Sequence, residues 1–170
     1  ELTGTLPSNY EDYTSYKYEF HDTLSKGLTY NSDVKVYVKN GTDEEVEITG
    51  YTVTPANGTA TTTPTADTAI TVTKSVTIGK DSKIIVKYSA TLNENAVVGG
   101  EGNTNTVKLV YSNDPNGTST GTTKDNKAIV YTFQLNVTKV DGTNNGTKLA
   151  GAKFKLYYET NNTKHYVKEV

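Results

Sequence analysis

An aspartate lies in an unusual position in this sequence. Side chains alternate between the two faces of an extended strand, so the segment 16–22 puts Asp22 in phase with an aromatic row. That row consists of Tyr16, Tyr18 and Phe20. A carboxylate is costly to bury unless it is paired or protonated. Asp22 is therefore either a satisfied structural group, such as a turn cap, or a residue kept for chemistry.

Two asparagines and a lysine show the same irregularity. Asn103 and Asn105 are in phase with the apolar residues of a predicted strand over 104–112, where a buried carboxamide needs hydrogen-bond partners. Lys139 ends another apolar row, formed by Phe133, Leu135 and Val137. Read structurally, the asparagines are buried hydrogen-bonding residues and the lysine extends from a strand end to water.

Aspartate, asparagine and lysine are together the residue types needed for a spontaneous amide cross-link. A neutral lysine amine attacks the carboxamide carbon and ammonia leaves. Burial keeps the amine neutral and keeps a nearby carboxyl protonated, so that it can polarise the carboxamide. Contact between the groups replaces an external catalyst, and the reaction needs no cofactor and no metal. It runs once per domain, so the chain is not predicted to be a turnover enzyme.

The spacing assigns roles in this reaction. Asp22 fits the proton donor and Asn105 the acceptor, with Asn103 as the alternative on the same face. No lysine within residues 1–130 is in an inward phase. We therefore expect the first domain's lysine on a strand before Glu1, and we expect Lys139 to serve a second domain.

The composition is that of an all-β protein that positions these residues on strands. Thr, Val, Tyr, Asn and Gly are abundant, and alternating segments are separated by turn signals such as Asn40-Gly41. Strands are predicted over 16–22, 33–39, 46–54, 70–78, 83–92, 104–112, 127–140, 152–159 and 165–170. One helical turn is predicted over 93–100, and an Asn-rich turn at 161–162.

Charge and residue counts exclude several classes of protein. A net charge of −2 and a pI near 5.7 give no electrostatic footprint for nucleic acid. No apolar run is long enough to span a bilayer, so this segment is not expected to insert into a membrane. The chain has no cysteine, hence no disulfide, and its two histidines are too isolated to indicate a metal site. A calcium ion in the loop 112–117 remains an alternative.

The organisation predicts one nearly complete β-sandwich over residues 1–134, with its first strand missing. Residues 135–170 are predicted to be the opening strands of a second domain, too few to bury a sandwich core alone. The chain is thus expected to be a segment cut at both ends.

Three segments resemble shaft pilins of Gram-positive bacteria, which sortases link into pili. YKYEFHDTLSKGLTY (16–30) resembles the Y-x-F-x-D-T-L-x-x-G-L-T-Y signature of their isopeptide-forming fimbrial domain, and GNTNTVKLVYSNDPN (102–116) resembles its downstream signature. VTKVD (137–141) followed by LAGAKFKLY (149–157) is similar to the opening of a collagen-adhesin B-type (CnaB-like) domain.

The resemblance implies immunoglobulin-like β-sandwiches strung along an extracellular, cell-wall-anchored pilus, each locked by a Lys–Asn isopeptide bond. It implies Asp22 as the catalytic acid, Asn105 as the bonded asparagine and Lys139 as the lysine of the next domain. The implied partners are neighbouring pilin subunits in a covalent polymer and the pilus-assembling sortase.

Two other functions stay open at this point. One is a surface adhesin or tip pilin that binds a host surface ligand. The other is a carbohydrate-active enzyme, which needs paired carboxylates in a cleft. The acidic run Asp43, Glu44 and Glu45 is better interpreted as a solvated surface beside a turn.

Overall fold

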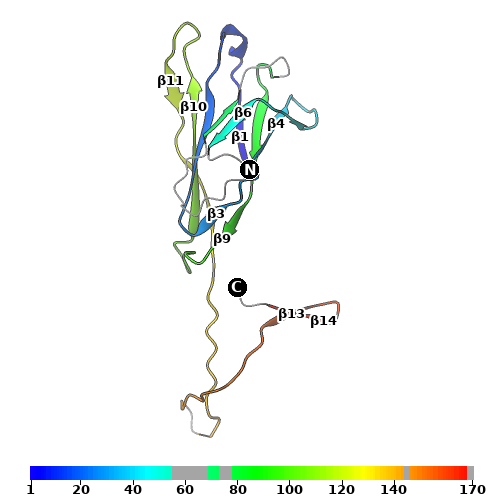
Figure 1. Ribbon diagram of the computed structural model, residues 1–170, viewed down its shortest axis with the longest axis vertical. Helices are drawn as coiled ribbons and strands as arrows, with labels where there is room; N and C mark the ends of the chain where they lie inside the picture. The colour runs from blue at the N-terminus through cyan, green and yellow to red at the C-terminus, as the bar shows by residue number, and fades with distance from the viewer. Residues whose placement is uncertain (55–68, 73–77, 144–145, 168–170) are drawn as a thin grey trace. The chain divides into compact units, whose positions relative to one another are not determined.

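The computed structural model describes residues 1–54, 69–72, 78–143 and 146–167, with the backbone alone for 69–72. The chain divides into two compact units, Glu1–Phe133 and Gln134–Val170. Figure 1 shows the strands of both units. The predicted all-β class is confirmed, since the described secondary structure is strands apart from one short 3-10 helix, η1 (Tyr10–Asp12).

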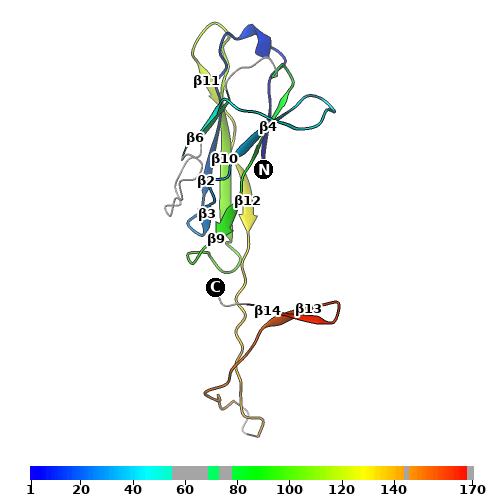
Figure 2. The same ribbon diagram turned by 45° about the vertical axis from the view of Figure 1, so that its right-hand side comes forward.

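Two antiparallel sheets form the first unit, as seen in Figures 1 and 2. The four-stranded sheet has the order β1 (Leu2–Thr5), β8 (Lys83–Lys87), β4 (Lys35–Lys39) and β5 (Val46–Glu47). The six-stranded sheet runs β11 (Thr120–Thr122), β10 (Asn103–Ser112), β2 (Tyr18–Leu24), β7 (Ala69–Val72) and β6 (Tyr51–Thr54), with β12 (Asn126–Val130) also paired to β10. A short ladder joins β3 (Leu28–Tyr30) to β9 (Ala90–Leu92).

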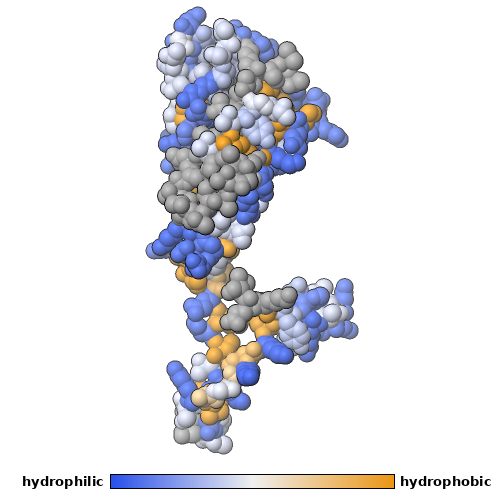
Figure 3. All heavy atoms as spheres, in the orientation of Figure 1, coloured by the Kyte–Doolittle hydropathy of each residue, from blue (hydrophilic) through white to orange (hydrophobic). Residues whose placement is uncertain are grey.

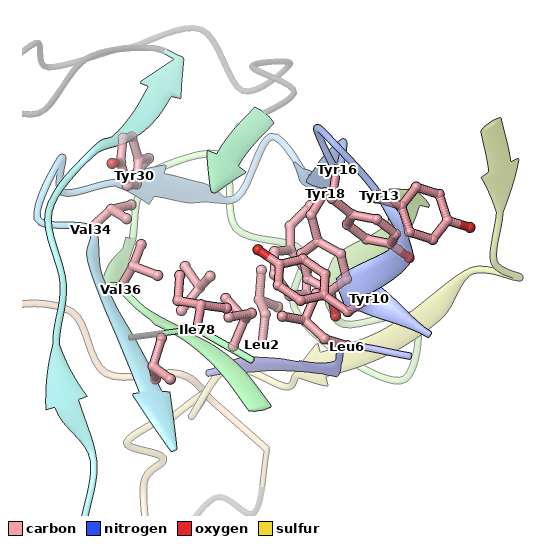
Figure 4. Close-up of a cluster of buried hydrophobic side chains, with 14 residues drawn as sticks. Leu2, Leu6, Tyr10, Tyr13, Tyr16, Tyr18, Tyr30, Val34, Val36 and Ile78 are labelled. Atoms are coloured by element: carbon pink, nitrogen blue, oxygen red, sulfur yellow. The ribbon is translucent and has the colours of Figure 1, made fainter. Parts of the chain in front are cut away.

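Tyrosines supply much of the core between these sheets. The predicted inward row of Tyr16, Tyr18, Phe20 and Asp22 is buried throughout. The aromatic rings meet edge to face, with centroids 4.7 Å apart for Tyr13 and Tyr16, a geometry favoured by the ring quadrupole. Valines and isoleucines of β4 and β8 complete the cluster. Figure 4 shows part of it, including Val34, Val36 and Ile78. The alternation predicted for the segment 16–22 is therefore confirmed.

The central strand β10 brings the predicted site residues onto one face. Its pairing with β2 sets Val107 opposite Asp22 and Asn105 opposite Leu24. Its other edge is shared, with β12 along the first half and β11 along the second. Since residues i and i+2 of a strand share a face, Asn105 lies on the same side of the sheet as Asp22.

Two predicted strands are each divided between sheets. The segment 46–54 breaks at Gly50, whose φ of 83° is accessible to glycine, and continues as β6 in the other sheet. The segment 83–92 breaks at Ser89, whose backbone N–H donates to Asp33 Oδ1 at 2.8 Å. The apolar pattern changes phase at Gly50, from Val46 and Ile48 to Tyr51 and Val53, so the sequence indicates that break. The alternation of 83–92 runs on through Ser89, so the sequence does not indicate the second break.

The helical turn predicted over 93–100 is wrong. Asn93 instead closes a tight turn, because its backbone carbonyl accepts from the Ala96 N–H at 3.0 Å and its Oδ1 accepts from the Asn95 N–H at 2.9 Å. Asparagine favours such turns since its side chain competes for backbone groups. The next residues follow an irregular path that includes an isolated bridge at Val98.

Among its described residues, the second unit contains the hairpin of β13 (Tyr157–Thr160) and β14 (Thr163–Tyr166), and an isolated antiparallel bridge between Val140 and Lys148. The predicted turn is confirmed, with Asn161 and Asn162 at positive φ. The strand predicted over 127–140 forms a ladder only in β12, and 152–159 only in its last residues. The predicted inward side chains are exposed, Phe133 by 86% and Phe154 by 57%. Figure 3 shows apolar residues on the surface of this unit. Within the described residues of the second unit, a lone hairpin has no facing layer to cover it.

Candidate cross-linking site

Asp22 is buried in the first unit, with 3% of its surface exposed. Burial disfavours the charged form and raises the pKa of the Asp22 carboxyl. Hydrogen bonds from Tyr88 and Asn105 act in the opposite direction without cancelling this effect. The carboxyl group thus has the environment required of an acid that stays protonated.

Asn105 and Tyr88 contact this carboxyl group from different strands. The Asn105 Nδ2 donates to the Tyr88 hydroxyl oxygen at 2.7 Å and to Asp22 Oδ2 at 3.4 Å. The Tyr88 hydroxyl donates to the same Asp22 Oδ2. Tyr88 follows directly after β8, so the four-stranded sheet contributes one member of the cluster and the six-stranded sheet the other two.

Two oxygens of this cluster are buried without a hydrogen-bond partner. They are Asp22 Oδ1 and Asn105 Oδ1. Buried polar atoms are nearly always paired, so such a concentration is unusual. Protonation of Asp22 gives the carboxyl group an O–H donor, whereas the charged form offers acceptors alone. The carboxyl contacts the amide nitrogen of Asn105, so polarising the carboxamide oxygen requires the amide to turn.

Asn103 has a different environment from Asn105. It is wholly buried, and its Oδ1 accepts from the Val97 N–H at 2.8 Å while its Nδ2 donates to the carbonyls of Val97 at 3.2 Å and Val130 at 3.3 Å. It packs so closely on Gly27 that a Cβ there would lie 2.0 Å from its Oδ1. Of the two alternatives predicted from the sequence, Asn105 is the one that contacts Asp22.

Asn105 also lines a cleft of about 550 Å³. The cleft is bounded by β1 on one side and by β10 and residues 123–128 on the other. Both β1 and β12 are edge strands of their sheets. The cleft therefore gives access to the carboxamide between two sheet edges.

No described lysine of the first unit has a contact with Asp22 or Asn105. Lys17 pairs with Glu19 at 3.2 Å, and Lys87 pairs with Glu45. Lys139 belongs to the second unit and is exposed, and its backbone carbonyl accepts from the Leu149 N–H at 3.0 Å. The structure thus brings Asp22 and Asn105 together, while the lysine predicted for the first domain is expected before Glu1 and Lys139 stays assigned to the second domain.

Sequence reasoning missed Tyr88 as a member of the site. Tyr88 falls within the predicted strand over 83–92, and no chemistry was predicted for it. A signal was present, because a buried tyrosine hydroxyl needs a polar partner and Asp22 needed one too. Nothing in the spacing linked residues 66 positions apart.

The other candidate sites find little support among the described residues. The described residues contain no group of three or more histidines or acidic residues that could hold a metal ion. In the loop 112–117, Asp114 Oδ1 accepts from the Asn116 N–H at 3.0 Å and so closes its own turn. The acidic run 43–45 is exposed, as expected of a solvated surface. No helix in the described part of the chain is long and apolar enough to cross a membrane.

Comparisons with known proteins connect this geometry to a family. The family model described as Gram-positive pilin backbone subunit 2, Cna-B-like domain, matches residues 4–115, which include Asp22, Tyr88 and Asn105. The trypsin-resistant surface T6 protein of Streptococcus pyogenes serotype M6 is 28% identical over 94% of this chain. The chain spans about a third (32%) of that relative's length. No solved structure matches. The chain belongs to the Gram-positive backbone pilins, and its first unit is a Cna-B-like β-sandwich of the immunoglobulin type.

Proposed function

We propose that this chain is a segment of a pilus shaft subunit whose first domain is locked by an isopeptide bond to Asn105. The observation that carries this proposal is the buried contact between Asp22, which is placed to stay protonated, and the underpaired Asn105 carboxamide. Family membership supports the structural role on the cell surface. The pilus-assembling sortase and neighbouring pilin subunits are the partners that this role requires.

The reaction balances without a co-reactant. A neutral lysine Nζ attacks Cγ of Asn105, while the Asp22 carboxyl donates a hydrogen bond to the developing oxyanion. The Cγ–Nδ2 bond then breaks, and Asp22 passes a proton to the departing nitrogen, which leaves as ammonia. The proton lost by the attacking amine restores the carboxyl group. One amide replaces another, and a single event per domain suffices.

The attacking lysine is proposed to enter through the cleft beside Asn105. The described lysines of the first unit that line the cleft, Lys108, Lys124 and Lys127, are exposed. A strand laid between β1 and β12 would instead carry an inward lysine past the carboxamide, as expected for residues before Glu1. Residues 1–134 are then the first domain and 135–170 open the second, where Lys139 is proposed to form the equivalent bond.

A covalent bond between strands suits a fibre under tension. Hydrogen-bonded strands separate when a force exceeds the sum of weak bonds, whereas strands joined by an amide bond remain connected. The streptococcal relative is named for its resistance to trypsin. A β-sandwich that is closed covalently would favour such resistance, because proteases act on locally opened chain.

Intact mass spectrometry tests the proposal. The sample is the first domain with the native residues that precede Glu1, ending before Lys139 and so excluding the second-domain lysine. We expect the loss of one ammonia, abolished by Asp22→Ala and by Asn105→Ala. Asn126→Ala is the matched control, because Asn126 lines the same cleft and does not contact Asp22 in the structure.

Three outcomes would contradict the assignment. A deficit that survives Asn105→Ala but disappears in Asn103→Ala or Asn126→Ala would move the bond to that residue. A deficit that survives Asp22→Ala would remove the acid from the mechanism. Full mass in folded wild-type protein would overturn the cross-link altogether.

A further inference from the structure

The Tyr88 hydroxyl lies between the two residues of the proposed reaction. It contacts Asp22 Oδ2 on one side and Asn105 Nδ2, at 2.7 Å, on the other. We propose that Tyr88 is a third catalytic residue, whose hydroxyl holds the Asn105 carboxamide and donates to its oxygen in the transition state. This inference rests on the proposed isopeptide bond and extends it to a residue outside both sequence signatures.

Packing fixes the position of the Tyr88 hydroxyl. Its ring meets the buried ring of Tyr30 edge to face, with centroids 5.8 Å apart. Desolvation, followed by the hydrogen bond to Asp22, raises the pKa of the Tyr88 hydroxyl. The raised pKa favours the protonated hydroxyl, which can act as a donor rather than as a base.

The ground-state contacts hold the Asn105 side chain but do not yet activate it. In the structure Asn105 presents its Nδ2 to both partners, and its Oδ1 is buried without one. A half turn of the terminal amide exchanges these two atoms, which have nearly the same shape. The carboxamide oxygen then takes the place that lies 2.7 Å from the Tyr88 hydroxyl and 3.4 Å from Asp22 Oδ2.

In this orientation two donors converge on the carboxamide oxygen. They are the O–H of a protonated Asp22 and the Tyr88 hydroxyl, whose single proton turns from Asp22 Oδ2 to the carboxamide oxygen once Asp22 carries a proton of its own. A tyrosine beside a protonated aspartic acid also forms the oxyanion hole of ketosteroid isomerase. The charge that develops on oxygen when the amine attacks Cγ is stabilised by both groups. Tyr88 keeps its proton throughout, so Asp22 remains the group that transfers a proton to the leaving ammonia.

The rate of cross-linking in Tyr88→Phe tests this role. Full-length protein is made by cell-free synthesis, and samples taken over time are unfolded in denaturant and digested with trypsin. The tryptic peptide 88–108 contains Asn105, and its cross-linked fraction reports the bond. Loss of one oxyanion donor is expected to slow the reaction by about 10²-fold.

Tyr18→Phe is the matched control. Tyr18 is a buried tyrosine of the same core, and its hydroxyl has no hydrogen-bond partner in the structure. The same chemical deletion there is expected to leave the cross-linking rate unchanged. If Tyr18→Phe slows the bond as much as Tyr88→Phe does, the effect is one of packing and the inference is overturned.

The experiment distinguishes failure of the proposed bond to Asn105 from failure of the proposed role of Tyr88. Absence of a cross-link on peptide 88–108 in wild-type protein refutes the proposed bond to Asn105. A cross-link that forms at the wild-type rate in Tyr88→Phe leaves that bond standing and refutes the role of Tyr88. If Tyr88→Phe does not fold, a fluorinated tyrosine at position 88 keeps the shape and strengthens the donor. A faster reaction then supports the inference, and an unchanged or slower one overturns it.

Discussion

Two asparagines on one face of β10 have opposite environments. Asn103 has each end of its carboxamide paired with backbone groups of Val97 and Val130. Asn105, two residues further along the strand, has a buried Oδ1 with no hydrogen-bond partner and an Nδ2 that donates only to side chains. Strand, face and residue type are the same for both. The two side chains differ in their neighbouring groups and in how many of their hydrogen bonds those groups complete.

This difference separates a structural group from a reactive one. A carboxamide with all its bonds made to backbone is held in one state, and any chemistry at it would first break those bonds. A carboxamide held by a tyrosine and a buried acid can be polarised once its oxygen turns toward them. The following predictions test whether the contrast is real, from the largest expected effect to the smallest.

Asn103→Ala is expected to cause the largest loss of stability. It leaves the N–H and carbonyl of Val97 and the carbonyl of Val130 without their partner in a buried setting. With each unsatisfied group costing about 1–3 kcal/mol, the free energy of unfolding should fall by about 3 kcal/mol or more. Denaturant unfolding of chain 1–170, followed by tyrosine fluorescence, measures it. A loss below about 1 kcal/mol would mean that Asn103 does not anchor this region.

Gly27→Ala should disturb the same region from the other side. A Cβ at position 27 would lie 2.0 Å from Asn103 Oδ1 and 2.7 Å from the Ala96 Cα. Neither atom can retreat easily, since one is fully hydrogen-bonded and the other belongs to the backbone. We expect a loss of about 2 kcal/mol in the same unfolding assay. Ala substitution at Gly100, where a Cβ would meet nothing within 4 Å, is the control and should change stability little.

The sequence predicted the face of each of these residues but not their contacts. Alternation placed Asp22, Asn103 and Asn105 inward, because a period of two needs only local information. It could not choose between the two asparagines, since the choice depends on the irregular path of residues 96–98 and on the contact with Tyr88, and alternation predicts neither. The same limit hid the change of sheet at Ser89, whereas the shift of apolar phase at Gly50 is visible in the sequence.

The second unit shows a different limit. The in-phase apolar residues of 133–137 and 154–158 predict a buried face, and such a face requires a second layer. The described residues of that unit provide one hairpin, so these side chains are exposed. The pattern reports which side of a strand is apolar, whereas burial depends on what packs against that side.

Asp22→Asn should change how stability depends on pH. The pKa of Asp22 is raised on folding, so between its unfolded value of about 3.9 and its higher native value the folded state holds a proton that the unfolded state has lost. Wild-type stability should therefore fall, relative to Asp22→Asn, as pH rises through that window, and then level off above the native pKa. Unfolding free energies of both proteins at pH values from acid to neutral measure this.

The opposite trend would change the interpretation of the site. If wild-type protein gains stability relative to Asp22→Asn as pH rises, the fold favours the carboxylate. The Tyr88 hydroxyl and Asn105 amide would then act as donors to a charged structural group, and Asp22 would be a poor acid for the cross-link.

Asn105→Ala is expected to have the smallest effect on stability in chain 1–170. The substitution removes a hydrogen bond of 2.7 Å and a long one of 3.4 Å, but it also removes a buried oxygen that has no partner. These contributions nearly cancel, so the change should stay within about 1 kcal/mol. The same denaturant assay therefore compares two Asn→Ala changes two residues apart on one strand. If Asn105→Ala costs as much as Asn103→Ala, both asparagines are anchors, and incomplete pairing no longer distinguishes a reactive carboxamide from a structural one.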